Sequence, residues 1–108
     1  MIKKSKVVFA NEKLEKAFND LKESDPLKGF IRRAIKDIEE NAFCGIRLPS
    51  KLNPKDYVKK YKINNVWKYN LPNGWRLLYS ITTPNNIEIL SAILNWFDHK
   101  NYERKLKY

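Results

Sequence analysis

The chain has 108 residues, 43% of them hydrophobic and 13% aromatic, which suits one small domain with a real core and excludes a disordered chain. Lysine and arginine outnumber aspartate and glutamate by 22 to 12, which gives a net charge of +10. This charge favours polyanionic partners, although a lysine-rich surface that only keeps the protein soluble would explain it equally well. No apolar run is long enough for a membrane span or a secretory signal. The single cysteine, Cys44, excludes a disulfide framework, so we expect a cytoplasmic protein.

The first half of the chain predicts one strand and two helices. Residues 6–10 (KVVFA) are a short run of β-forming residues, and residues 11–24 place apolar side chains at helical spacing behind Asn11, a suitable N-cap. A second helix is predicted over residues 25–41, where Asp25 can act as the cap and a proline suits the first helical position. The tight break between them predicts an antiparallel pair of helices.

The second half predicts strands. Residues 44–54 contain a glycine and two prolines and are typical of a loop, and residues 56–63 fit either an extended segment or a helical turn. Turn signals PNG and PNN separate three runs rich in β-branched and aromatic residues, 64–71, 75–83 and 87–95. From Asp98 the chain predicts a short helix. We therefore expect a single α+β domain over residues 1–108, with an N-terminal strand and a helical hairpin packed on one face of an antiparallel sheet.

The PNG turn at residues 72–74 predicts which side chains share a face. A type I turn closed by a left-handed glycine makes a three-residue hairpin loop. The pairs on the face toward the helices are then Leu71–Trp75, Tyr69–Leu77 and Trp67–Tyr79. The opposite face carries Lys68, Asn70 and Arg76, and a one-residue slip would bury Lys68 and Arg76 under the helices. Two close cations favour a phosphate site, and a solvated outer face is the alternative.

Basic residues also gather in the segment from 47 to 76. It holds eight lysines and arginines, opposed by Asp56 as its one acidic residue. We expect the segment to contact RNA phosphates. The expected RNA-binding residues are Lys55, Lys59, Lys60, Lys62 and Asn70.

The C-terminal stretch WFDHKNYERKLKY contains the only histidine, His99. Asp98 fits an N-cap, and Phe97 and Tyr102 have the spacing of a hydrophobic staple. His99 and Tyr102 are three residues apart and are expected to be neighbours on one helix face, beside Lys100. One histidine supports neither a metal site nor a Ser-His-Asp triad, and spacing alone favours a surface residue.

The hairpin VWKYNLPNGWRLLYSI, the next strand and DHKNY together resemble the RelE/ParE toxin superfamily, and the preceding strand and helical hairpin have the same order as in that family. The resemblance covers nearly the whole chain and implies a RelE-like fold. RelE-like members cut mRNA in the ribosomal A site without a metal or other cofactor. The 2′-hydroxyl attacks the adjacent phosphate and leaves a cyclic phosphate.

The resemblance also assigns roles to residues. Arg76 matches the family's phosphate-stabilising hairpin arginine, and Lys68 matches a lysine in the strand before it. His99 and Lys100 match a basic pair ahead of the C-terminal tyrosine, and Tyr102 matches that tyrosine with a shorter spacing. Asn70 departs from the pattern, because the type member of the family has a second lysine at this position. Without that lysine as a general base, His99 becomes the main candidate for proton transfer.

The resemblance implies a type II toxin whose partners are mRNA on the ribosome and a cognate antitoxin protein. Two alternatives remain open. One is a ParE-like inhibitor of DNA gyrase, against which the combination of Lys68, Arg76, His99 and Tyr102 argues. The other is a non-catalytic RNA- or ribosome-binding protein of the same fold, which Asn70 keeps open.

Overall fold

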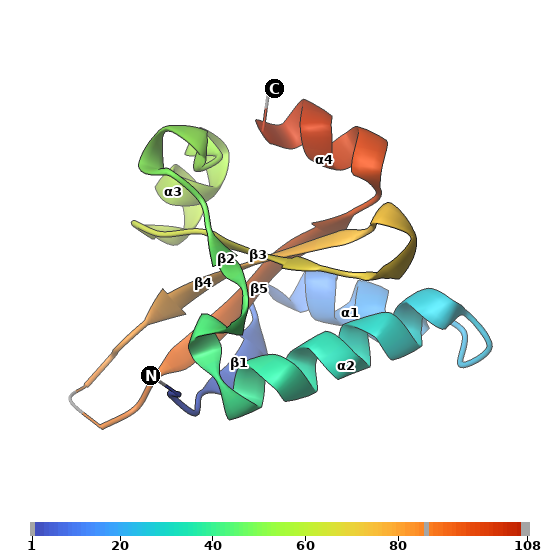
Figure 1. Cartoon of the computed structure of the whole chain (residues 1–108), viewed down its shortest axis with the longest axis horizontal. Coiled ribbons are helices and arrows are strands. Elements are labelled where there is room, and N and C mark those ends of the chain that lie inside the picture. Colours follow the sequence, from blue (N-terminus) through green and yellow to red (C-terminus); the bar gives the residue numbers. More distant parts are fainter. Residues whose placement is uncertain (1, 86, 107–108) are drawn as a thin grey trace.

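The computed structural model describes residues 2–85 and 87–106, which form one five-stranded sheet with helices on both faces (Figure 1). The strands follow the spatial order β1-β5-β4-β3-β2. Their bounds are β1 Lys6–Phe9, β2 Ile46–Arg47, β3 Trp67–Asn70, β4 Arg76–Thr82 and β5 Leu90–Phe97. The α+β class is confirmed.

The expectation of a purely antiparallel sheet is wrong at one edge. β1 pairs with β5 in parallel, with Lys6 opposite Leu90 and Phe9 opposite Ile93, whereas the remaining pairs are antiparallel. Parallel neighbours need a long connection that returns the chain to the same end of the sheet, and here both N-terminal helices and three strands lie between β1 and β5. The PNN turn expected at residues 84–86 lies partly outside the described residues.

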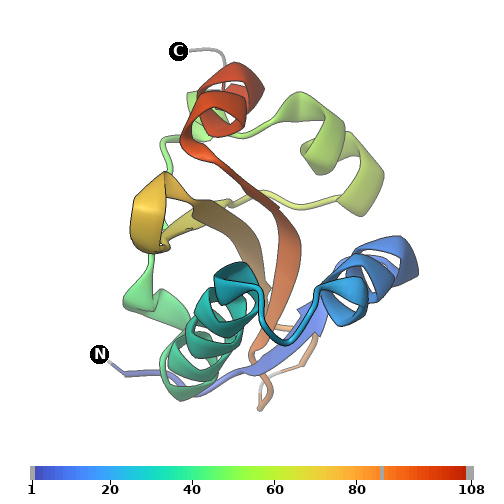
Figure 2. The ribbon, with the colours of Figure 1, turned by 90° about the vertical axis from the view of Figure 1, so that its right-hand side faces the viewer.

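Four α-helices and three short 3₁₀ turns cover the sheet within the described residues. The helices are α1 Glu12–Asp20, α2 Pro26–Glu40, α3 Lys55–Tyr61 and α4 His99–Leu106. The 3₁₀ turns are Ala42–Cys44, Ser50–Leu52 and Pro72–Gly74. Figures 1 and 2 show α1 and α2 together on one face of the sheet, with α3 and α4 on the other. The segment 56–63, for which the sequence left two possibilities, is mainly helical, because α3 extends to Tyr61.

The predicted caps start the first two helices. The Asn11 side chain accepts the N–H of Leu14 at 2.7 Å, and the Asp25 side chain accepts the N–H of Leu27 at 3.0 Å. α1 ends at Asp20, earlier than expected. The break is stabilised by the buried Lys28, whose ammonium donates to the carbonyl of Leu21 at 3.0 Å.

The predicted hairpin register is confirmed. Trp67 lies opposite Tyr79, Tyr69 opposite Leu77 and Asn70 opposite Arg76. Leu77 and Tyr79 are fully buried against α1 and α2. The expected turn differs in one respect, because Asn73 is left-handed (φ 61°) as well as Gly74 (φ 80°). Asparagine tolerates this conformation better than most residues, so the loop keeps its length and the strands keep their register.

The second face of the sheet is more apolar than expected. The cluster on it consists of Leu48, Tyr57, Val66, Leu78, Leu94, Tyr102 and Leu106. Residues from α3 and α4 close this cluster over β3, β4 and β5. This face therefore carries a second small core.

The segment 44–54, expected to be a loop, contains the two-residue strand β2. Gly45 permits β2 to approach the sheet, because a Cβ there would lie 2.7 Å from both the Lys68 carbonyl oxygen and the Tyr79 hydroxyl. The N–H of Gly45 donates to that hydroxyl at 3.0 Å. No helix in the described part of the chain has the length and apolar composition needed to cross a bilayer.

Candidate active site

Two cations lie on the second face of the sheet, close to the β3–β4 turn. Lys68 pairs with Leu78 and Arg76 pairs with Asn70, so both basic side chains project toward α3 and α4. Both approach the ring of Tyr102, from α4. The Lys68 ammonium and the Arg76 guanidinium carbon are each 5.9 Å from the centroid of this ring. The structure therefore brings together three of the five residues expected to be catalytic.

The charges of Lys68 and Arg76 are not neutralised by the rest of the described chain. The salt bridges found among the described residues include neither of them. Arg76 is held by a hydrogen bond to the carbonyl of Trp75 at 3.0 Å, and the Tyr102 ring offers both cations its negative face. Both side chains are half-buried. Two fixed, partly desolvated cations without a carboxylate make this point favourable for an anion.

Tyr102 is fixed by the start of α4. The Asp98 side chain accepts the N–H of Asn101 at 2.8 Å, which confirms the predicted N-cap. The N–H of Tyr102 donates to the Asp98 carbonyl at 2.8 Å, and the residue is only 3% exposed. Phe97 packs against the same apolar cluster, as the predicted staple requires. The ring is thus a rigid support for the two cations.

His99 lies beside this group but faces a different environment. The His99 Cβ lies 3.4 Å from the position that a Cβ would take on Gly74, so His99 is next to the hairpin turn. Its Nε2 is 2.9 Å from a carboxylate oxygen of Glu103, and the side chain is 64% exposed. His99 thus pairs with Glu103 at the surface, whereas Tyr102 is buried. The i,i+4 spacing could have revealed Glu103 in the sequence.

The remaining predicted site residues are exposed. Lys100 lies in the first turn of α4, and Asn70 lies at the end of β3. The expected RNA-binding lysines are on α3 or at its end, namely Lys55, Lys59, Lys60 and Lys62. None of these four forms a salt bridge with another described residue.

A contact between α3 and α4 closes the layer above the site. Lys105 forms a salt bridge with Asp56 and lies 4.2 Å above the ring of Tyr57. The hydrogen bond from Lys105 lowers the pKa of the Asp56 carboxyl, and burial raises the pKa of the Tyr57 hydroxyl. The one acidic residue of the basic segment is therefore already paired.

A basic groove of about 610 Å³ runs between the N-terminal side of α3 and the end of α4. Lys51, Lys55 and Arg104 line it, together with the Asp56–Lys105 pair. Arg104 was not among the expected RNA-binding residues, because the sequence does not show that the end of α4 meets α3. Three cations without salt bridges among the described residues make this groove suitable for a phosphate backbone.

Comparisons of the chain with protein-family models, with curated proteins and with solved structures gave no match. Among residues 2–85 and 87–106, no group of three or more histidine, cysteine, aspartate or glutamate side chains is arranged to hold a metal ion. The chemistry that the described groups can perform is binding of an anion by Lys68 and Arg76, with proton transfer at the adjacent His99–Glu103 pair.

Proposed function

We propose that the chain is the toxin of a type II toxin-antitoxin system, a RelE-like, metal-independent endoribonuclease that cuts mRNA on the ribosome. The observation that carries the proposal is the convergence of Lys68 and Arg76 on the ring of Tyr102. These residues occupy the positions at which the sequence resembles the RelE family. A net charge of +10 supports a polyanionic substrate.

In the proposed reaction, the 2′-hydroxyl oxygen of one nucleotide bonds to the adjacent phosphorus. The bond from phosphorus to the 5′-oxygen of the next nucleotide breaks. A base accepts the proton of the 2′-hydroxyl, and an acid supplies a proton to the leaving 5′-oxygen. The products are a 2′,3′-cyclic phosphate and a 5′-hydroxyl, and neither an oxidant nor a water molecule is consumed.

The residues divide this work by their chemistry. Arg76 and Lys68 stabilise the negative charge that builds on the non-bridging oxygens, because donors aimed at developing charge lower a reaction barrier most effectively. His99 transfers a proton, with Glu103 orienting its imidazole at 2.9 Å. Tyr102 positions the two cations, and the exposed Lys100 attracts the flanking phosphate.

The proposal is tested by induced expression of the wild type, Arg76→Ala and a matched control, Arg33→Ala. Arg33 is an exposed arginine of α2, on the face of the sheet opposite α3 and α4. We expect growth arrest and mRNA cleavage, mapped by primer extension, for the wild type and Arg33→Ala but not for Arg76→Ala. Equal toxicity of all three proteins would reject the site. No cleavage by the wild type would reject the nuclease.

A second function, RNA or ribosome binding without catalysis, is favoured by one specific observation. His99 is 64% exposed and paired with Glu103, whereas a proton-transfer group usually lies against its substrate. Under this alternative, the wild type and His99→Ala bind ribosomes equally well and neither cuts mRNA. Sedimentation with ribosomes, followed by primer extension on the same samples, separates the two functions.

A further inference from the structure

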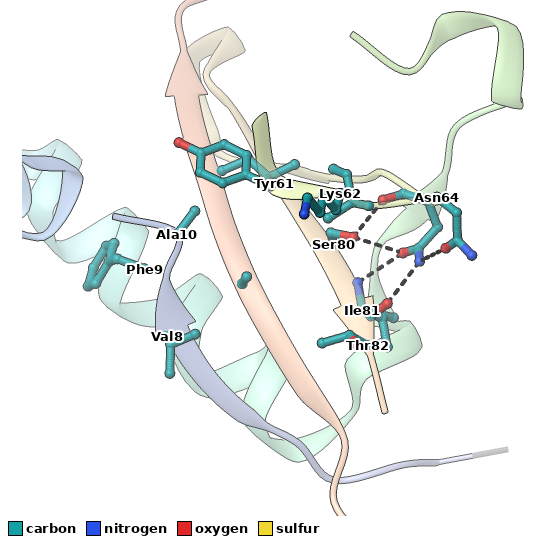
Figure 3. Close-up of a pocket in the computed structure, with 13 residues that line it drawn as sticks. Val8, Phe9, Ala10, Tyr61, Lys62, Asn64, Ser80, Ile81 and Thr82 are labelled. Atoms are coloured by element: carbon teal, nitrogen blue, oxygen red, sulfur yellow. Dashed lines mark hydrogen bonds between the residues drawn. The ribbon is translucent and has the colours of Figure 1, made fainter. Parts of the chain in front are cut away.

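A cavity of about 360 Å³ lies on the second face of the sheet, beyond the C-terminal end of α3 (Figure 3). Its sheet side is lined by small side chains, which are Val8, Ser80 and Ala92 from three strands and Ala10 directly after β1. The chain from 61 to 65 forms the opposite wall. The neighbouring part of this face is filled by leucines and tyrosines, so the smaller side chains leave unfilled space here.

The cavity is separate from the candidate active site. Arg76, Leu78 and Ser80 alternate along β4 and project to the same face. Arg76 belongs to the site and Ser80 lines the cavity, and four residues of strand span about 13 Å. The apolar cluster that contains Leu78 and Tyr57 lies between them. A ligand in the cavity would therefore not touch the cations around Tyr102.

Hydrogen bonds hold the wall of the cavity in place. The Asn65 side chain donates to the Ile81 carbonyl at 2.8 Å and accepts the Ile81 N–H at 2.9 Å, replacing the next pair of the β3–β4 ladder. The same side chain donates to Asn64 Oδ1 at 2.8 Å (Figure 3). Asn64 itself is exposed, so it supports the wall from its solvent side.

The rim of the cavity is aromatic and positively charged. The Tyr61 ring forms one side, and Lys60 lies 5.4 Å from its centroid. Lys62, which also lines the cavity, has φ 54° and ψ 44°, a left-handed conformation that favours glycine over lysine. Lys59, Lys60 and Lys62 are exposed and form no salt bridge within the described part of the chain. This charge fits an anionic backbone around the opening.

We propose that the cavity binds one nucleobase of a single-stranded RNA, while the flanking phosphates lie against the lysines at the end of α3. The inference rests on the proposed function, which makes RNA the ligand, and it adds a second site at which the protein contacts that RNA. An aromatic ring and apolar side chains bind the face of a base, and such contacts tolerate different bases.

The test follows the alanine methyl groups of the wild-type protein by NMR as RNA is added. The probes are a short oligoadenylate and an oligomer of equal length in which every nucleotide lacks its base. We expect the methyl signals of Ala10 and Ala92 to shift with oligoadenylate and not with the abasic oligomer. The Ala34 methyl, fully buried under the other face, is the internal control and should not move.

A variant fills the cavity. Ala92→Leu should bind oligoadenylate about tenfold more weakly than the wild type and bind the abasic oligomer equally well, as measured by fluorescence anisotropy. The wild-type methyl shifts test the inference even if this variant does not fold.

Three results would overturn the inference: oligoadenylate binding that leaves Ala10 and Ala92 unshifted, equal shifts with the abasic oligomer, or no binding of either oligomer. A peptide-binding cavity would give the third result. Cleavage of mRNA on ribosomes by the same wild-type preparation distinguishes these failures from failure of the proposed function. A protein that cuts mRNA without these shifts keeps its function and lacks the nucleobase site.

Discussion

Replacing Asn65 with alanine should destabilise the fold by much more than an exposed asparagine normally does. Besides its bond to the exposed Asn64, the Asn65 side chain makes three hydrogen bonds of 3.1 Å or less. It donates to the Ile81 carbonyl at 2.8 Å and accepts the Ile81 N–H at 2.9 Å and the Trp67 indole N–H at 3.1 Å. A hydrogen bond contributes about 0.5–1.5 kcal/mol net. Asn65→Ala should therefore lower the free energy of unfolding by about 2–4 kcal/mol.

The matched control is the neighbouring residue. Asn64 is exposed, and its side chain accepts one hydrogen bond, from Asn65 at 2.8 Å. Asn64→Ala should change stability by no more than about 0.5 kcal/mol. Both variants are measured by urea denaturation, with the tryptophan fluorescence as the signal. If Asn65→Ala and Asn64→Ala unfold at the same urea concentration as the wild type, then the Asn65 side chain does not hold the 61–65 segment to β4.

Three further predictions concern RNA binding, pH and the products. Changing Lys59, Lys60 and Lys62 together to glutamine should reduce the log–log salt slope of RNA affinity by roughly two to three units, and an unchanged slope would mean that they contact no phosphate. Burial, and then the hydrogen bond to Asp37, raise the pKa of Tyr69 to about 12. Its contribution to stability is therefore complete below about pH 10 and lost as the pH rises toward 12, and Tyr69→Phe should abolish this part of the alkaline loss in denaturation curves. Mass spectrometry of the cleaved RNA should find 2′,3′-cyclic phosphate ends, whereas 3′-hydroxyl ends would contradict the proposed reaction.

Local signals in the sequence predicted the parts of the fold that local interactions determine. Asn11, Asp25 and Asp98 each accept a backbone N–H from the first turn of the helix that follows. The Pro72–Gly74 loop and the alternation of apolar and polar residues on either side of it were enough to predict the β3–β4 register. A one-residue slip would have buried Lys68 and Arg76. That register also brought the two cations onto one face.

The features that the sequence did not reveal depend on distant contacts. Strand β2 has only two residues, and it is positioned by the contact of Gly45 with Tyr79, which is 34 residues away. The layer over the second face depends on the Lys105–Asp56 pair, 49 residues apart, and neither residue signals the other by spacing. The parallel pairing of β1 with β5 joins the first strand to the last, more than 80 residues apart in the sequence. The His99–Glu103 pair is different, since helical spacing alone predicts it.

The central claim, that Arg76 holds a scissile phosphate beside Tyr102, is tested most directly by single-turnover cleavage of mRNA on purified ribosomes. The rate for Arg76→Ala is compared with the rates for the wild type and for Arg33→Ala, after circular dichroism has established that all three proteins are folded. Loss of a donor aimed at developing charge predicts a rate about 10²–10³ lower for Arg76→Ala and an unchanged rate for Arg33→Ala. Equal cleavage rates for Arg76→Ala and the wild type would contradict the account.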